Sequence, residues 1–360
     1  MNNRLEQVRA KLLDDQLDAL LISSAENRRY LSGFTGSAGY LVITQDQAML
    51  YTDFRYIEQS TQQAPNFQVV RMTGGYEWLP EFATEQGIRR IGFEASNLSY
   101  SIYKNFSDAF NTLKGKNKLE LLATLNIVEP LRALKDPNEL ALITKAVNIA
   151  DEAFLDVSST IEIGESELSI AWRLEQAMRV KGAEAISFES IVAVGPNAAL
   201  PHHRADDTPV IPGVPIVMDF GARFQGYCSD MTRTICLGKP DKTFRTVYDT
   251  VLGAQLAATV AIQAGLTCHE ADGIARSIID SAGHGEQFGH SLGHGIGLAV
   301  HEEPRVGPKV DWPLQNNTVF TIEPGIYIPG WGGVRIEDTV VMENGTVRSL
   351  TQSHKNENPR

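Results

Sequence analysis

Four carboxylates in two similar pairs of apolar strands are the side chains of this sequence best placed to do chemistry. Asp219 lies in the segment IVMDFGA and Asp230 in CSDMTRT, while Glu323 lies in VFTIEPG and Glu337 in GVRIEDTV. A buried carboxylate costs free energy unless it is paired or coordinated. A salt bridge or an edge position explains one such acid equally well, but it does not explain four acids in matched hairpins. Gathered at one point, the four would repel and raise one another's pKa, and a pair of divalent cations would remove that repulsion.

Histidine is unevenly distributed, because all eight histidines come after residue 201. His290, His294 and His301 fall within the segment GHSLGHGIGLAVHE. The first two stand four residues apart, which would suit a zinc pair on a helix. The glycines around them favour instead a loop or a strand in which backbone and metal approach closely. A single histidine is usually structural, whereas three in one glycine-rich segment indicate that they line a site.

The composition limits the class of protein. The chain has 360 residues, which favours two domains, and its 42% hydrophobic and 21% charged residues are typical of globular proteins. The net charge of −12 argues against a nucleic-acid partner. Apolar runs are only as long as strands, so we expect no membrane span and no signal peptide. Three cysteines without a CxxC pair favour a reduced, cytoplasmic compartment.

The first part of the chain alternates strand patterns with helical spacing, which predicts a small α/β domain. The predicted strands occupy residues 18–23, 40–43, 48–51 and 90–94.

Helix signals are clear in the second part. Asp136-Pro-Asn-Glu139 combines a capping residue, a proline at the first helical position and a capping-box acid. Helices are also expected at about 166–182 and 243–264, and after a second capping box at 267–270. The polar tail from Ser349 is expected to be loosely held.

The sequence resembles the metallopeptidases of the pita-bread fold, which include methionine aminopeptidase, aminopeptidase P and prolidase. The resemblance rests on MDFGA with SDMTRT, GHSLGHGIGLAVHE, TIEPGIY and GVRIEDT, in that order, and covers essentially the whole chain. It implies an α+β protein with a carboxy-terminal pita-bread catalytic domain, residues 129–360, and a smaller amino-terminal α/β creatinase-like domain, residues 1–128. The amino-terminal segments GFTGSAG and TDFRY look like those of aminopeptidase P and its small bacterial relatives. Creatinase shares this architecture but lacks the metal ligands that are complete here.

By this resemblance, two divalent metal ions are bound by Asp219, Asp230, His294, Glu323 and Glu337. Four oxygen donors and one nitrogen suit Mn²⁺, the metal expected in the family, or Co²⁺, and they tolerate Zn²⁺ and Fe²⁺. The two cations would lower the pKa of a bridging water, so that hydroxide exists near neutral pH and attacks the substrate carbonyl carbon. Glu323 would also act as general base and proton shuttle, and would deliver a proton to the leaving proline nitrogen.

The resemblance also implies roles for other residues around the substrate. His301 resembles the histidine that contacts the substrate carbonyl, and His290 resembles one that lines the substrate pocket. His202 matches the Pro-His position of the family, although His203 beside it leaves an ambiguity of one residue. A last pair, Tyr327 and Arg335, resembles the residues that orient carboxylate ligands of the metals.

The implied function is that of an Xaa-Pro aminopeptidase, which removes the first residue ahead of proline. The nearest alternative is an Xaa-Pro dipeptidase, or prolidase, restricted to dipeptides. An enzyme that also cuts Met-Xaa bonds and a metal-free binding homologue are remoter alternatives. Small proline-containing peptides are the expected substrates, and the family suggests a homodimer without nucleic-acid or membrane partners.

Overall fold

The computed structural model describes residues 2–112, 119–356 and 358 and divides into two compact units, Met1–Leu131 and Arg132–Arg360. The expected boundary between residues 128 and 129 stays a prediction. Helix α6 (Glu129–Ala133) begins just after the expected boundary and contains the division between residues 131 and 132. Within the described part of the chain, no helix has the length and apolar character needed to cross a bilayer.

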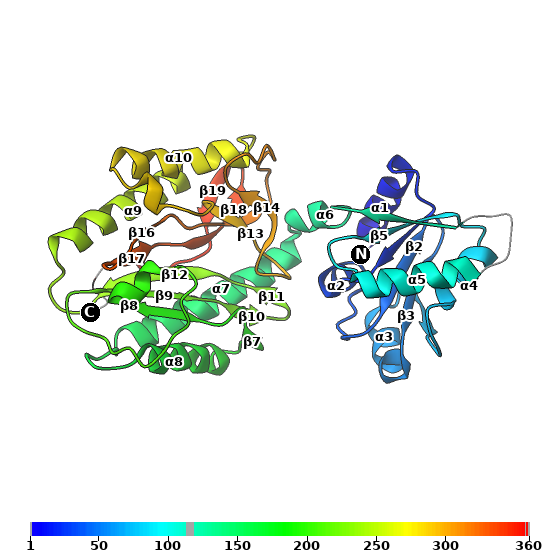
Figure 1. The fold of residues 1–360 in the computed structure, drawn as a ribbon, viewed down its shortest axis with the longest axis horizontal. Helices are drawn as coiled ribbons and strands as arrows, with labels where there is room; N and C mark the ends of the chain where they lie inside the picture. Colours follow the sequence, from blue (N-terminus) through cyan, green and yellow to red (C-terminus); the bar gives the residue numbers. More distant parts are fainter. Residues whose placement is uncertain (1, 113–118, 357, 359–360) are drawn as a thin grey trace. The chain divides into compact units, whose positions relative to one another are not determined.

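The first unit is built on a mixed six-stranded sheet, as Figure 1 shows. The strand order is β4-β3-β2-β1-β5-β6, with β2 antiparallel to its neighbours β1 and β3 and the outer strands added in parallel. All four predicted strands are confirmed. The strands are β1 (Ala19–Ile22), β2 (Tyr40–Thr44), β3 (Ala48–Thr52), β4 (Gln68–Arg71), β5 (Arg90–Glu94) and β6 (Glu120–Thr124).

Helices cover this sheet and complete the small α/β unit. One apolar core joins alternate strand residues to Leu79, Phe82 and Phe106 of α4 and α5. Gly33 ends α2 in a left-handed conformation (φ 84°), so the glycine-rich segment is a turn that leads into β2. The helical elements are α1 (Asn2–Asp14), α2 (Ala25–Ser32), η1 (Phe54–Tyr56), α3 (Ile57–Gln63), α4 (Trp78–Glu85) and α5 (Tyr100–Thr112).

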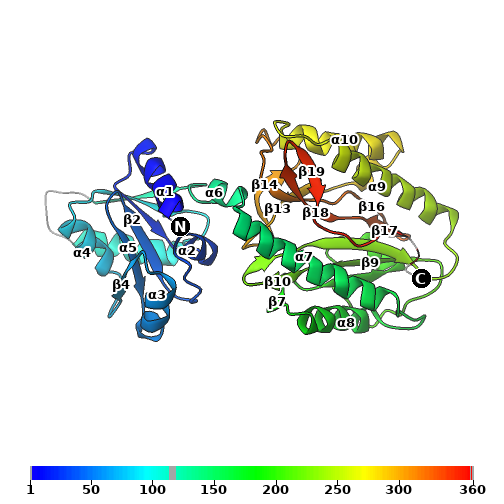
Figure 2. The same cartoon turned by 180° about the vertical axis from the view of Figure 1, so that it is seen from behind.

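The second unit consists of two halves of similar plan, each a sheet covered by a pair of helices (Figures 1 and 2). In the first half, α7 and α8 pack on the sheet β12-β9-β8, and β11-β10-β7 form a smaller sheet beside it. The elements of this half are α7 (Pro137–Ser158), α8 (Glu167–Val180), β7 (Ala185–Ile186), β8 (Ile191–Val194), η2 (Gly195–Ala199), β9 (Pro215–Phe220), β10 (Ala222–Phe224), β11 (Tyr227–Cys228) and β12 (Met231–Cys236).

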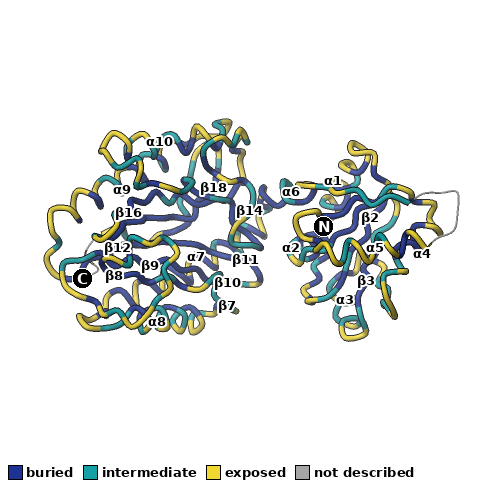
Figure 3. Tube along the Cα trace, viewed as in Figure 1, coloured by how far each residue is buried: buried dark blue, intermediate teal, exposed yellow. Residues whose placement is uncertain are grey.

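In the second half, α9 and α10 pack on the sheet β14-β13-β15-β18-β19 and on the hairpin β16-β17. The strands between the helix layers are buried, whereas the outer helix faces are exposed (Figure 3). The elements of this half are α9 (Lys242–Ala261), α10 (Cys268–Ser281), η3 (Gly285–Gln287), β13 (Gly293–Gly295), β14 (Glu302–Val306), β15 (Val319–Ile322), β16 (Gly325–Ile328), β17 (Gly332–Arg335), β18 (Asp338–Glu343) and β19 (Thr346–Ser349).

Local sequence signals account for the helix starts. Asp136 and Glu139 form the predicted capping box at the start of α7, and Thr267 and Glu270 form the second at the start of α10. Caps of this kind satisfy backbone N–H groups that lack partners inside the helix.

The tail after Ser349 differs from the expectation, because it is firmly held. We define residues 350–355 as the C-terminal strap. Leu350 is only 2% exposed, and the backbone N–H groups of Gln352 and Ser353 donate to the carboxylate of Asp151 on α7. Polarity suggested solvent exposure, but here the polar groups of the strap are satisfied by buried charged partners.

Candidate metal centre

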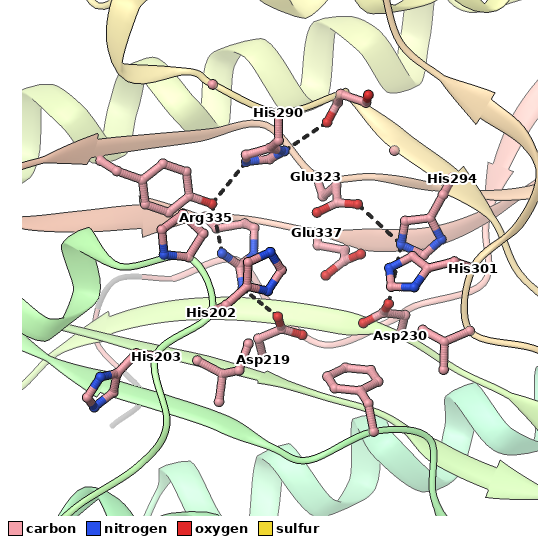
Figure 4. A pocket seen from close by; sticks show the side chains of 18 of the residues that line it. His202, His203, Asp219, Asp230, His290, His294, His301, Glu323, Arg335 and Glu337 are labelled. Atoms are coloured by element: carbon pink, nitrogen blue, oxygen red, sulfur yellow. Dashed lines mark hydrogen bonds and ion pairs between the residues drawn. The ribbon is translucent and has the colours of Figure 1, made fainter.

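The four predicted acids converge on one point between the two halves of the second unit (Figure 4). Asp219 lies on β9, Asp230 immediately precedes β12, Glu323 follows β15 and Glu337 lies between β17 and β18. Each half therefore contributes one acid from within or beside a strand and one from the returning segment. The repeated sequence plan thus places all four carboxylates together, as predicted.

Two glycines allow the strands that carry these residues to approach closely. A Cβ atom on Gly221 would lie 1.9 Å from the carbonyl oxygen of Ser229, and one on Gly293 would lie 1.9 Å from that of Thr321. Only glycine fits at such distances. The MDFGA and GHG segments therefore need their glycines to bring Asp219 and His294 into place.

His294 faces the acids from β13. Its Nε2 lies 3.5 Å from Oδ2 of Asp230 and 3.4 Å from Oε1 of Glu323. Its Nδ1–H donates to the carbonyl of Gly295 at 3.0 Å, which leaves the Nε2 lone pair directed at the carboxylates. Burial lowers the pKa of His294 and so favours the neutral ring that can bind a metal.

The carboxylates have the free oxygens that cation binding requires. Among the described residues, Oδ1 of Asp219, Oδ1 of Asp230 and Oε1 of Glu337 are buried without a hydrogen-bond partner. Ligand atoms of Asp230, His294 and Glu337 all lie within 4.8 Å of one another. Buried, unpartnered carboxylate oxygens are unstable unless a cation is bound, so this donor set fits divalent metal ions.

The electrostatics of the cluster point the same way. Burial, followed by repulsion from Glu337, Asp219 and Glu323, raises the pKa of Asp230 well above its usual value. Burial and the charges of Glu323 and Asp219 likewise raise the pKa of Glu337. In the metal-free protein these groups therefore favour the protonated form, and bound cations would favour the charged form.

Arg335, Tyr327 and His290 form a hydrogen-bonded chain beside the acids. The buried guanidinium of Arg335 donates to Asp219 and, at 2.7 Å, to the hydroxyl of Tyr327. Tyr327 in turn donates to Nε2 of His290 at 3.0 Å, while Nδ1–H of His290 donates to the Ser291 carbonyl. Burial raises the pKa of Tyr327 to about 12, so it stays a donor. The chain fixes one oxygen of Asp219 and orients His290.

Two threonines that the sequence analysis did not single out also hold the acids. Thr232 Oγ1 donates to Oε2 of Glu337 at 2.7 Å, and Thr321 Oγ1 donates to Oε1 of Glu323 at 3.1 Å. Each threonine stands two residues from one of the acids in sequence, Thr232 after Asp230 and Thr321 before Glu323. Alternation along a strand places such pairs on one face, a signal that could have identified both threonines.

The acids lie in a cavity of about 700 Å³, which His202 and His301 also line. The rings of His294 and His301 are 4.3 Å apart. Burial lowers the pKa of His301 and favours its neutral form. Apolar parts of the lining come from Phe188, Ile191 and Val300.

The structure separates the roles of the two adjacent histidines. His202 points toward the acids, whereas His203 points away from them (Figure 4). Nε2 of His203 is 2.6 Å from Oε2 of the buried Glu167. Glu167, His203 and Asp206 could also hold a metal by proximity. However, both oxygens of Glu167 already accept hydrogen bonds, including those from the backbone N–H groups of Val194 and Asp206.

Charged side chains surround the cavity and its neighbourhood. Arg204 and Arg305 line the cavity and are exposed, and Arg305 donates to Ser291 Oγ at 2.7 Å. Glu302 directly follows His301 in the chain. Its side chain is buried and paired with Arg132 and Lys135. This buried cluster, which local sequence patterns did not indicate, anchors the segment that carries His301.

Comparisons with known proteins agree with the motifs. The model of metallopeptidase family M24 matches residues 141–344, and that of the creatinase/prolidase N-terminal domain matches residues 4–134. The Xaa-Pro dipeptidase of Pyrococcus furiosus is 37% identical over 99% of this chain and 99% of its own length.

Two solved structures are similar over almost the whole chain. An Xaa-Pro dipeptidase from Bacillus anthracis has a TM-score of 0.94 and 40% identity, and covers 98% of both chains. An X-Pro aminopeptidase from Thermotoga maritima has a TM-score of 0.87 and 38% identity, and covers 98% of this chain and 99% of its own.

Proposed function

The chain belongs to metallopeptidase family M24, and from that premise we propose that it is a dinuclear-metal Xaa-Pro aminopeptidase. The expected family, its pita-bread catalytic domain with a creatinase-like amino-terminal domain, and the assignment as an enzyme are confirmed. The proposed reaction hydrolyses the bond between an amino-terminal residue and a following proline. The observation that carries the proposal is the group of unpartnered, buried carboxylate oxygens around one cavity.

Two divalent ions would be held by Asp219, Asp230, His294, Glu323 and Glu337. Their four carboxylates and one imidazole favour Mn²⁺, and they also suit Co²⁺, Zn²⁺ or Fe²⁺. When bound, the ions supply Lewis-acid activation of water and of the substrate carbonyl. We also propose a homodimer, which the family resemblance supports. A cytoplasmic location is supported by the three cysteines, which are free and buried.

Glu323 would move the proton during the reaction. It accepts a proton from the attacking water and passes it to the proline nitrogen as the peptide bond breaks. In the metal-free protein, burial raises the pKa of Glu323. The hydroxyl of Thr321 bonds to Oε1, so the side chain has a defined orientation.

The histidines would position the substrate. Neutral His301, beside His294, donates a hydrogen bond to the carbonyl oxygen on which negative charge develops. His202 and His290 would form polar edges of the site for the proline ring, and Phe188, Ile191 and Val300 supply the apolar part of the cavity lining. The nitrogen of that ring carries no N–H in the substrate, so apolar walls with few donors suit it.

An Xaa-Pro dipeptidase is the second candidate, and a specific observation favours it. Arg204 and Arg305 line the cavity, where they could bind the free carboxylate that directly follows proline in a dipeptide. Relatives named as Xaa-Pro dipeptidases support the same alternative. Comparing kcat/KM for Xaa-Pro, Xaa-Pro-Xaa and Met-Ala peptides tests the choice. Efficient cleavage of Xaa-Pro-Xaa supports the aminopeptidase, and cleavage of Xaa-Pro alone supports the dipeptidase.

A further inference from the structure

The C-terminal strap, residues 350–355, is attached to the same buried side chains that fix the backbone of Glu337. We propose that the strap is a positioning element of the metal centre, acting through Arg233 and Asp338. The inference rests on the proposed function, because it concerns how tightly the centre binds its metal ions. Among the described residues, the hydrogen bonds and ion pairs of the strap reach Asp151, Arg233 and Asp338 but none of the five ligand side chains, so its effect on the metal centre is indirect.

The middle of the strap is fixed to α7. The carboxylate of Asp151 is buried and accepts hydrogen bonds from the backbone N–H groups of Gln352 at 2.8 Å and Ser353 at 2.9 Å. The hydroxyl of Ser353 donates to the same carboxylate. Hydrogen bonds to a charged acceptor are stronger than neutral ones, so this attachment is firm.

Arg233 connects the strap to the metal centre. It is 1% exposed, and its guanidinium donates to the carbonyls of Ser353 at 2.8 Å and His354 at 3.1 Å. The same guanidinium donates to the carbonyl of Glu337 at 2.6 Å. The fork of donors on arginine has a fixed geometry, so a shift of the strap would shift the Glu337 backbone.

Lys355 is a second cation that pairs with the buried carboxylate at this connection. Its Nζ lies 2.5 Å from Oδ2 of the fully buried Asp338, which also pairs with Arg233 at 2.8 Å and accepts from Gln255 at 3.0 Å. Asp338 directly follows Glu337 in the chain. Loss of Lys355 would remove the ion-pair partner of Oδ2 and leave Arg233 as the one cation on Asp338 among the described residues, so it would disturb the arrangement of Asp338 and Arg233.

The consequence falls on one metal ligand. The N–H of Glu337 donates to the Thr232 carbonyl at 3.0 Å, and its own carbonyl accepts from Arg233. Its backbone is therefore held on both sides, while Oε1 stays free. Residues that orient metal ligands typically change metal affinity by about 10- to 100-fold when they are replaced.

The test compares K355M with a matched control, K181M. Lys181 lies in the same unit and has the same 20% side-chain exposure as Lys355. It pairs with Asp156 at 2.7 Å and with Glu152, neither of which belongs to the metal centre. Calorimetry with Mn²⁺ on chelator-treated full-length protein measures affinity. The visible spectrum of the Co²⁺ form reports ligand geometry, and thermal unfolding of the metal-free form reports stability.

We expect K355M to weaken Mn²⁺ binding by about tenfold or more and to alter the Co²⁺ spectrum, K355R to restore both, and K181M to change neither. Unchanged Mn²⁺ affinity in K355M would overturn the inference even if its stability fell. If K355M does not fold, S353A should weaken binding less but in the same direction, and unchanged affinity there would equally overturn it. A wild-type protein that binds no Mn²⁺ would contradict the proposed function itself, which distinguishes the two failures.

Discussion

The hydroxyl of Thr232 donates a 2.7 Å hydrogen bond to Oε2 of Glu337, although the two residues belong to opposite halves of the second unit. A backbone hydrogen bond of 3.0 Å from Glu337 to Thr232 joins the same two segments. This contact fixes one oxygen of Glu337 and leaves the other free beside Asp230 and His294. The join between the halves is thus also where the acids and His294 of the candidate metal centre converge.

Neutralising one acid should remove activity without removing the fold. In D230N we expect kcat/KM to fall below about one thousandth of the wild-type value, with loss of bound metal. The metal-free variant should unfold at the same temperature as metal-free wild type or higher, because one of several repelling buried carboxylates is gone.

Metal content by mass spectrometry and thermal unfolding in chelator check this prediction. The exposed Asp249 on α9 provides a control, since D249N should keep both metal and activity. An active D230N protein with its full metal content would rule out the proposed ligand set.

The metal-free protein should depend on pH in a defined direction. Burial, and then Glu337 and Asp219, raise the pKa of Asp230, so the folded protein retains a proton that the unfolded chain releases. The resulting stabilisation is fully present below the ordinary carboxyl pKa of about 4 and is lost as pH rises through the raised value.

Urea unfolding in chelator, from about pH 5 to about pH 8, should therefore show wild type losing stability relative to D230N as pH increases. The difference between the two proteins removes the contribution of titrating groups outside the carboxylate cluster. A constant difference across this range would contradict the account.

The two adjacent histidines should give opposite results. H202N is expected to lower kcat by about a hundredfold with little change in stability, because His202 faces the cavity. H203N should lower stability by about 1–3 kcal/mol, because buried Glu167 loses a hydrogen-bond partner. Steady-state kinetics and urea unfolding of both variants test this, and the reverse pattern would show that His203 is the functional residue.

The preference of the enzyme for dipeptides over longer peptides should depend on the arginines that line the cavity. If they bind the carboxylate of a dipeptide, R305M should raise KM for Xaa-Pro by about tenfold and leave Xaa-Pro-Xaa nearly unchanged. R204M tests the second arginine in the same assay, and R245M, at an exposed position on α9, is the control. Equal effects of R305M on both substrates would contradict a role in carboxylate recognition.

Much of the fold could be predicted because its signals are local. Capping boxes at Asp136 and Thr267 identified two helix starts. Short apolar segments identified four of the six strands of the first sheet. The convergence of Asp219 and Glu323 followed from a repeated plan in which an acid occupies an apolar strand. An acid in such a place is informative, because its burial needs a physical reason.

The contacts that support the site could not be predicted in the same way. The pairing of Glu302 with Arg132, and the hydrogen bond of Ser353 to Asp151, join segments far apart in sequence. No periodicity marks such partners, and a polar tail has the same composition whether it is bound or free. The strap is therefore the clearest error of the sequence interpretation, because tertiary contacts decided its structure.

The most direct test of the central claim is a Mn²⁺ titration of chelator-treated protein, monitored by the initial rate of hydrolysis of an Xaa-Pro peptide and of a matched Xaa-Ala peptide. We predict no hydrolysis without metal, a rate on the Xaa-Pro peptide that saturates near two equivalents per chain, and little hydrolysis of Xaa-Ala. Undiminished hydrolysis by the metal-free protein, or two bound ions without cleavage of any Xaa-Pro peptide, would contradict the account.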